Sequence, residues 1–208
     1  MVKNPLKADA VARIEAAIGA AEKSSRAEMV ALLAVRASEY RATGLALAIM
    51  ATFAAGMLVW AFLPWAGAAE VLLAEFVSFL ALLALMELTP LGDRLTPRQI
   101  KAVAARRLAR AAFLEEGLAS TPERNGVLFF VSLAEHHIEI IADQGIDQQV
   151  ATAEWQAVID SFTQQVRRGE IEAGFVEAIE ALAVILARHY PANGGRADEL
   201  SNRLVVLG

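Results

Sequence analysis

The sequence predicts an α/β sandwich that is interrupted by a two-helix transmembrane hairpin. First, about thirty residues, 43–74, carry a single charge, Glu70, and a run of this length can cross a bilayer. Second, the flanking segments mix amphipathic helical patterns with short continuous apolar runs, which is typical of a few strands covered by helices. The expected order is helix, strand, membrane hairpin, helix, strand, strand and three helices.

Residues 1–43 are expected to form the first part of a soluble domain. Apolar residues recur at three- and four-residue steps over 8–23, which predicts an amphipathic helix. Residues 28–35 (EMVALLAV) form a short apolar run that we interpret as a buried strand. Their alanine and leucine content leaves a helix open as the alternative.

Residues 44–91 are expected to form the hairpin. Segments 44–63 and 71–91 are each of a length that can cross the hydrocarbon core as a helix, and a short turn joins them. The alternative is a pair of helices buried in a soluble core. The length of the run favours the membrane, as do Trp60 and Trp65, which stand where an interfacial aromatic belt is expected.

Basic residues on both flanks predict the orientation of the hairpin. The turn carries no lysine or arginine, whereas Arg94, Arg98 and Lys101 follow the second segment and are expected to meet lipid headgroups. Because basic residues tend to stay in the cytoplasm, both termini should be cytoplasmic and the protein should lie in the inner membrane. Residues 1–25 show no apolar signal-peptide core, and the absence of cysteine fits a reducing compartment.

Small residues recur every four positions on the first membrane segment, at Gly44, Ala48, Thr52 and Gly56. Residues of this size allow close helix contact, so we expect this face to pack the two hairpin helices together. Contact with a foreign membrane protein is the alternative. Glu75 is expected near headgroup depth, with a buried polar partner in another subunit as its alternative.

Residues 92–208 should complete the soluble domain. Thr96 and Pro97 predict a helix start, with Thr96 as the cap, and the helix should run to about Glu116. Its inward residues are expected to be Ile100, Val103, Leu108 and Ala112.

Two strands and three helices are expected in the remaining chain. Residues 127–133 are continuously apolar, as in a strand covered on both faces, and a tight connection leads to a second strand over 136–142. The short connection predicts an antiparallel β-hairpin. Helical periodicity then covers 148–168, 171–189 and 197–207.

Several of these segments resemble the TPM domain family. The resemblance rests on residues 20–40, on the stretch 124–135 that begins Arg-Asn-Gly-Val, on 138–146 and on the closing pattern at 186–191. It covers residues 13–40 and 97–207. It implies an α/β/α sandwich that is often tethered to a membrane, with members linked to complex repair, calcium binding or acid phosphatase activity.

Candidate ligands and catalytic groups gather around the predicted β-hairpin. They are Glu135, His136, His137, Glu139, Asp143 and Asp147. Carboxylates with histidine could bind a metal that positions a phosphate, and we predict Glu135, Asp143 and Asp147 as ligands of a divalent cation such as calcium. Alternation along a strand argues against a single site, because adjacent histidines must point to opposite faces. The alternative is a polar sheet edge in which Asp143 forms an Asx turn.

These observations predict a non-catalytic accessory or assembly protein. The lipid membrane is one partner, and a membrane protein complex or a second copy of the chain is the other. Nucleic acid is not expected as a partner, because the net charge is −5. No Gly-rich phosphate loop, G-x-S-x-G elbow or cysteine nucleophile occurs in the sequence. The alternative function is a metal-dependent acid phosphatase that uses the acidic and histidine residues of 135–147.

Overall fold

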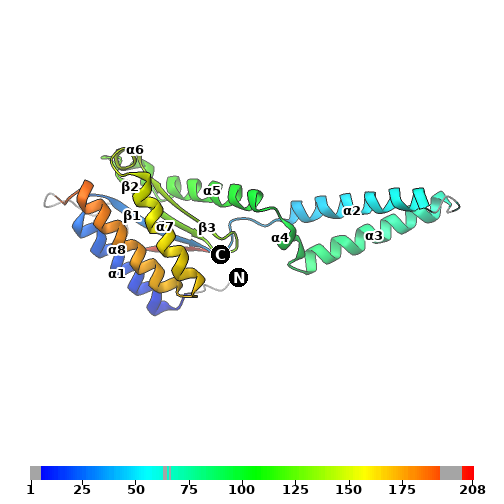
Figure 1. Cartoon of the computed structure of the whole chain (residues 1–208), viewed down its shortest axis with the longest axis horizontal. Coiled ribbons are helices and arrows are strands. Elements are labelled where there is room, and N and C mark those ends of the chain that lie inside the picture. The colour runs from blue at the N-terminus through cyan, green and yellow to red at the C-terminus, as the bar shows by residue number, and fades with distance from the viewer. Residues whose placement is uncertain (1–5, 63–64, 66, 193–202) are drawn as a thin grey trace. The chain divides into compact units, whose positions relative to one another are not determined.

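A computed structural model describes residues 6–62, 65, 67–192 and 203–208. The chain divides into two compact units. Met1–Ala37 and Ala102–Gly208 form the unit that holds the sheet, and Ser38–Lys101 form the unit that holds two long helices (Figure 1). The helical unit is therefore an insertion in the chain of the sheet unit.

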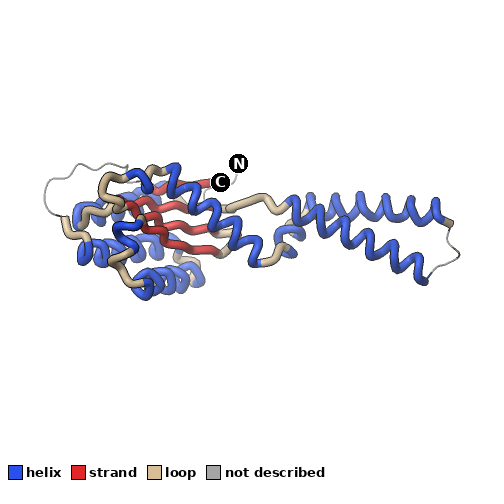
Figure 2. Tube along the Cα trace, turned by 90° about the horizontal axis from the view of Figure 1, so that it is seen from above, coloured by secondary structure: helices blue, strands red, loops and turns tan. Residues whose placement is uncertain are grey.

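Four strands form one sheet in the order β3-β2-β1-β4 (Figure 2). They are β1 (Glu28–Ala34), β2 (Gly126–Ser132), β3 (His137–Ala142) and β4 (Leu204–Leu207). β1 pairs in parallel with β2 and β4, whereas β2 and β3 pair antiparallel as the predicted hairpin. Every residue of β1 and β2 is buried, which confirms that both strands are covered on two faces.

Helices cover both faces of the sheet (Figure 1). On one face lie α1 (Ala8–Ser24), α7 (Thr152–Arg167) and α8 (Ile171–His189), which pack on the alternate strand residues that include Met29 and Phe129. On the other face lies α5 (Arg98–Glu115), which packs on the remaining set. The α/β/α sandwich expected from the sequence is confirmed.

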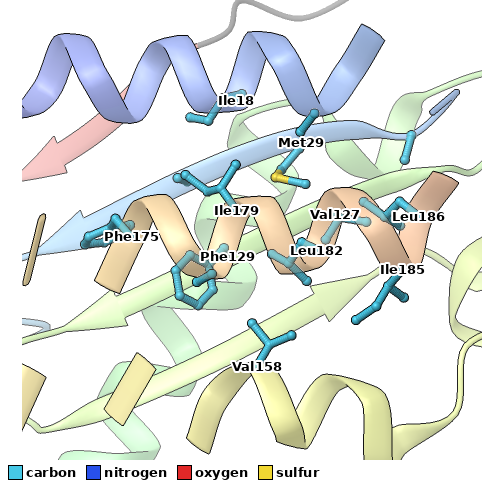
Figure 3. Packing of buried hydrophobic residues seen from close by; sticks show 14 of the residues in the cluster. Ile18, Met29, Val127, Phe129, Val158, Phe175, Ile179, Leu182, Ile185 and Leu186 are labelled. Atoms are coloured by element: carbon cyan, nitrogen blue, oxygen red, sulfur yellow. The ribbon is translucent and has the colours of Figure 1, made fainter. Parts of the chain in front are cut away.

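The larger core lies under α1, α7 and α8 (Figure 3). Three phenylalanines form its centre, with Phe129 of β2 at 5.1 Å from Phe162 and 5.4 Å from Phe175 between ring centroids. The rings meet edge to face, an arrangement that adds roughly 0.5–1.5 kcal/mol per pair beyond the burial of their area. Strand β2 therefore packs against both α7, which carries Phe162, and α8, which carries Phe175.

Short elements connect the regular ones. The 3-10 helix η1 (Leu118–Ser120) follows Gly117, whose φ of 77° ends α5 in the left-handed region that favours glycine. η1 lies so close to the start of β2 that a Cβ on Gly126 would lie 2.9 Å from the carbonyl carbon of Leu118. After β3, the chain turns through α6 (Gln144–Asp147).

The inserted unit is a helical hairpin. It consists of α2 (Arg41–Phe62) and α3 (Ala68–Leu88), followed by the short α4 (Leu91–Leu95). By length and composition both long helices can cross a membrane, and at 1.5 Å per residue they extend about 33 and 31 Å. No residue of α3 is buried, which contradicts the alternative of two helices in a soluble core.

The predicted C-terminal helix over 197–207 is wrong where the structure describes it. Leu204–Leu207 form strand β4, which extends the sheet beside β1, while residues 193–202 lie outside the described residues. A short apolar run fits either period, and here the open edge of β1 decides in favour of the strand.

The inward face predicted for α5 is also partly wrong. Ile100 and Val103 are 44% and 47% exposed, and the buried stripe consists of Ala105, Ala109, Ala112 and Phe113. Small alanine side chains let the helix backbone approach the sheet more closely than branched ones would. Thr96 closes α4, because its hydroxyl donates a 2.8 Å hydrogen bond to the Gly92 carbonyl.

Candidate functional site

Helix α2 turns one stripe of small side chains toward α3. Gly44, Ala48, Thr52 and Gly56 are the four residues of α2 that are buried, and all of α2 is described. A Cβ on Gly44 would lie 3.4 Å from the Cβ of Met86 in α3. The residues that the sequence assigns to helix packing therefore form the buried stripe of α2, and Gly44 at its start lies against α3.

At the other end of this stripe, Glu75 of α3 lies against Gly56. A Cβ on Gly56 would overlap the carboxylate of Glu75 and would lie 2.7 Å from its Cδ. Glu75 is half-buried and lies about two turns into α3. Its carboxylate therefore packs on the partner helix of the same hairpin.

An ion pair closes the open end of the hairpin and was not predicted from the sequence. The guanidinium of Arg41 donates to both carboxylate oxygens of Glu87, with distances of 3.2 and 3.1 Å from Nε and 2.9 Å from Nη2 to Oε2. The signal available in the sequence was the position of both charges at the outer ends of the two apolar runs. Because Arg41 is largely exposed, the pair contributes little stability in water.

The predicted membrane-interface residues lie toward the two ends of the helical unit. Trp60 and Trp65, beside the turn, are 81% and 77% exposed. Arg94 and Arg98 are exposed after α3, and the Nζ of Lys101 lies 6.0 Å from the ring centroid of Tyr40. Aromatic side chains therefore flank one end of the apolar helices and basic side chains follow the other.

The acidic residues predicted as cation ligands do not come together. Glu135 lies in the turn between β2 and β3, where it accepts hydrogen bonds from the Ser132 hydroxyl and from the Ala37 amide at 3.0 Å. Asp143 follows the opposite end of β3, about 20 Å away for a strand of this length. Asp147 is exposed on α6. A site that uses all three residues is therefore not formed.

Asp143 caps α6 and pairs with an arginine. Its Oδ1 accepts hydrogen bonds from the Gln144 amide at 2.7 Å and from Arg124, at 3.1 Å from Nε and 2.9 Å from Nη2. The carboxylate is buried, whereas the arginine is more than half exposed. These contacts resemble the turn expected as the structural alternative for Asp143, and they place it beside the stretch Arg-Asn-Gly.

The Arg-Asn-Gly stretch ties the amino ends of β1 and β2 together. Asn125 is fully buried, donates from its side-chain amide to the Arg26 carbonyl, and donates from its backbone amide to the Thr121 hydroxyl at 3.1 Å. Nearby, the Tyr190 hydroxyl donates to the Gly145 carbonyl at 2.6 Å. These side chains have structural roles that the sequence pattern did not disclose.

Two buried oxygens at this edge have no hydrogen-bond partner in the described part of the chain. They are Oδ1 of Asn125 and Oδ2 of Asp143, and oxygens of this kind are ligands of calcium. Calcium takes six to eight oxygens, however, and Arg124 already neutralises Asp143. Among the described residues no three His, Cys, Asp or Glu side chains are placed to hold a metal ion. The described residues therefore do not fit a calcium site at this edge.

Two of the three histidines lie beside a carboxylate, and the third lies in a turn. His137 Nε2 lies 3.0 Å from Glu139 Oε2 on the same face of β3, and His189 Nε2 lies 3.3 Å from Glu154 Oε1. His136 has a φ of 51° in the turn that precedes β3. None of these arrangements gathers the histidines with Asp143 into one site.

Comparison with known proteins agrees with this fold. Residues 93–185 match the family model of the TPM domain. No curated protein matches the sequence. Among solved structures, the NMR structure of the BA42 protein from the psychrophilic bacterium Bizionia argentinensis is similar with a TM-score of 0.63 and 19% identity. The similarity covers 99% of this chain and 98% of that chain, and at this identity it shows a shared fold.

The family match begins in α4 and continues into α8, so it includes the β2–β3 hairpin and the helices that cover it. The described α1 and β1, which precede the match, complete the same sandwich. Residues 93–185 therefore match the TPM domain, and the chain carries, inserted after β1, two helices long and apolar enough to span a membrane.

Proposed function

We propose that this chain is an integral accessory or assembly protein of the inner membrane. The hairpin anchors the TPM domain, and the domain acts on the cytoplasmic side as an interaction module for a membrane protein complex. The proposal rests on one observation: large apolar side chains are exposed over most of the length of both α2 and α3.

The exposed side chains are large. They include Phe53, Trp60, Phe62, Leu72, Leu73, Phe76 and Leu88, each at least 60% exposed. Contiguous apolar surface of this extent is rare on monomeric soluble proteins and marks contact with lipid or with another protein. Helices of about 31–33 Å also match the hydrocarbon thickness of about 30 Å, and a helix satisfies its own backbone polar groups there.

Charge distribution supports the proposed orientation. The turn between the helices carries no lysine or arginine, whereas arginines precede α2 and follow α3. Because translocation of basic residues is disfavoured, both ends of the hairpin remain in the cytoplasm, and so does the TPM domain from which they arise.

Single cysteines test the anchor and its orientation. The chain contains no cysteine, so Trp65→Cys near the turn and Gly208→Cys at the C-terminus each report without background, and the unsubstituted protein is the matched control. In intact cells with a permeable outer layer, an impermeant maleimide should label position 65 and should label position 208 only after the inner membrane is opened. Labelling of both positions from one side would exclude the hairpin.

Isolation in mild detergent tests the accessory role. The tagged full chain should recover one defined membrane protein partner in reproducible proportion. The control is a chimera in which residues 41–95 are exchanged for an unrelated two-span hairpin, so that the anchor is kept and its surface is changed. A partner bound through the TPM domain persists in the chimera, and a partner bound through α2 and α3 is lost. A chain that always elutes without a partner contradicts the proposal.

The phosphatase alternative gains no specific support from the site. Its acidic and histidine residues divide between the two ends of β3, and Asp143 is engaged by Arg124. We therefore do not advance catalysis as a second function.

A further inference from the structure

One surface of the TPM domain has no role in the packing of the sandwich: the outer face of α5. We call it the arginine face and define it as Val103, Arg106, Arg107, Arg110 and Leu114. All five residues are exposed, with Val103 at 47% and Leu114 at 66%.

The arginine face is continuous. At 100° per residue, its five positions fall within an arc of about 100° and extend over roughly 16 Å of helix. The buried stripe of α5, centred on Ala105, Ala109 and Ala112, lies on a different side of the helix. No acidic residue falls within this arc, so three positive charges stand between two apolar side chains.

The three arginines are not used by the fold. Arg106, Arg107 and Arg110 make no hydrogen bond or ion pair with any described residue. Other arginines of this unit do pair, such as Arg124 with Asp143 and Arg203 with Glu116, each at 2.9 Å. The charges of the arginine face therefore remain available to an external anion.

We propose that the arginine face binds anionic lipid headgroups of the leaflet in which the hairpin ends, an inference that rests on the proposed anchoring function. Guanidinium groups match phosphate oxygens in a bidentate geometry, and basic residues flanked by apolar ones are typical of helices that lie in a membrane interface. Continuity of the chain supports the lipid as the occupant, because α5 begins only ten residues after α3 ends at Leu88. The overall charge of −5 does not favour nucleic acid.

A fluorophore on the arginine face tests the proposal. The full chain with Val103→Cys, labelled with an environment-sensitive dye, is reconstituted into vesicles of phosphatidylcholine alone or with about one third phosphatidylglycerol. Lipids that carry a quencher report contact. A dye on Val184→Cys, which is 60% exposed on α8, is the matched control. Quenching at position 103 should rise with phosphatidylglycerol and fall in 1 M salt, while quenching at position 184 should not change.

Neutral and charge-conserving variants separate charge from fold. The triple change Arg106→Gln, Arg107→Gln, Arg110→Gln should shift the equilibrium away from the lipid by roughly fivefold per arginine, on the order of a hundredfold in all. The corresponding triple lysine variant should keep most of the quenching. Equal quenching in both vesicle types, or no loss in the glutamine variant, overturns the proposal. A dye that responds to added RNA or to an acidic protein but not to phosphatidylglycerol also overturns it.

Flotation distinguishes this inference from the anchoring function. Every variant should float with the vesicles through its hairpin, whatever the dye reports. Flotation without quenching at position 103 refutes the arginine face alone. A chain that does not float in any vesicle refutes the anchor on which the inference depends.

Discussion

A disulfide between Gly44→Cys and Met86→Cys should form within the hairpin. A Cβ on Gly44 lies 3.4 Å from the Cβ of Met86, close to the 3.5–4.5 Å that separates the Cβ atoms of native disulfides. Cysteine is smaller than the methionine that it replaces at position 86, so the cysteine side chain added at position 44 meets no larger side chain. Because the protein has no cysteine, the double variant contains only this pair of thiols.

The matched control is the pair Met50→Cys and Leu80→Cys. These positions lie at a similar level of the two antiparallel helices but are 68% and 47% exposed. For packed helices with axes 8–10 Å apart, Cα atoms on the outward sides are about 13 Å or more apart, whereas a disulfide requires less than about 7 Å. The first pair should therefore oxidise nearly completely under conditions that leave the second pair reduced.

The assay is protection from a maleimide of high mass. Membranes are treated with a mild oxidant, the protein is denatured, and remaining thiols are counted by the shift on a gel. Equal reactivity of the two pairs would refute the close approach at Gly44. Disulfides formed between chains rather than within one chain would show that α2 packs against a neighbour and not against its own α3.

Three substitutions in the unit that holds the sheet test its packing and its edge. Phe129→Ala should lower the free energy of unfolding by about 3–5 kcal/mol, followed by Trp155 fluorescence in denaturant, because the ring is fully buried between two others. Gly126→Ala should cost about 1–3 kcal/mol, since its Cβ meets backbone atoms that cannot rotate away, and an unchanged midpoint would contradict the contact with η1. Asp143→Asn should keep the cap on α6 and cost at most about 1 kcal/mol, because Arg124 is exposed. Metal-dependent hydrolysis of a phosphate ester that this last change abolished would instead support the phosphatase alternative.

The elements that the sequence predicted best were those whose length and flanking residues limited the interpretation. The bounds of α8 agree with the expected 171–189, and β1 and β2 agree within two residues at each end. Both strands are short apolar runs bounded by turn residues, as expected of a strand covered on both faces, although the alanine and leucine content of residues 28–35 left a helix open. The small residues at four-residue spacing on α2 are the four residues of this helix that the structure buries, as helix packing requires.

The features that the sequence did not predict depend on partners that are distant in the chain. Residues Leu204–Leu207 form a strand because β1 offers an open edge. No residue close to Leu204 in the sequence indicates that this edge is available. The predicted cation ligands lie apart for a related reason. Glu135 and Asp143 are close in the sequence, but a strand between them holds them at opposite ends of the sheet. The ion pair of Arg41 and Glu87 likewise required knowledge of how the two helices align.

The insertion point of the hairpin leads to a last prediction. The link between β1 and α2 can be cut without separating the N-terminal segment from the domain, because β1 is a central strand that pairs in parallel with β2 along its whole length and with β4 at its end. A specific protease site inserted between Ser38 and Glu39, which are both exposed, should be cleaved in the folded protein. After cleavage, an N-terminal tag should still recover the C-terminal fragment, since five consecutive residues of β1, 29–33, are each at most 2% exposed. The control adds denaturant before recovery, which should release the tagged fragment. Release by a simple wash would mean that β1 is not held as a central strand and that the domain depends on the covalent path through the membrane hairpin.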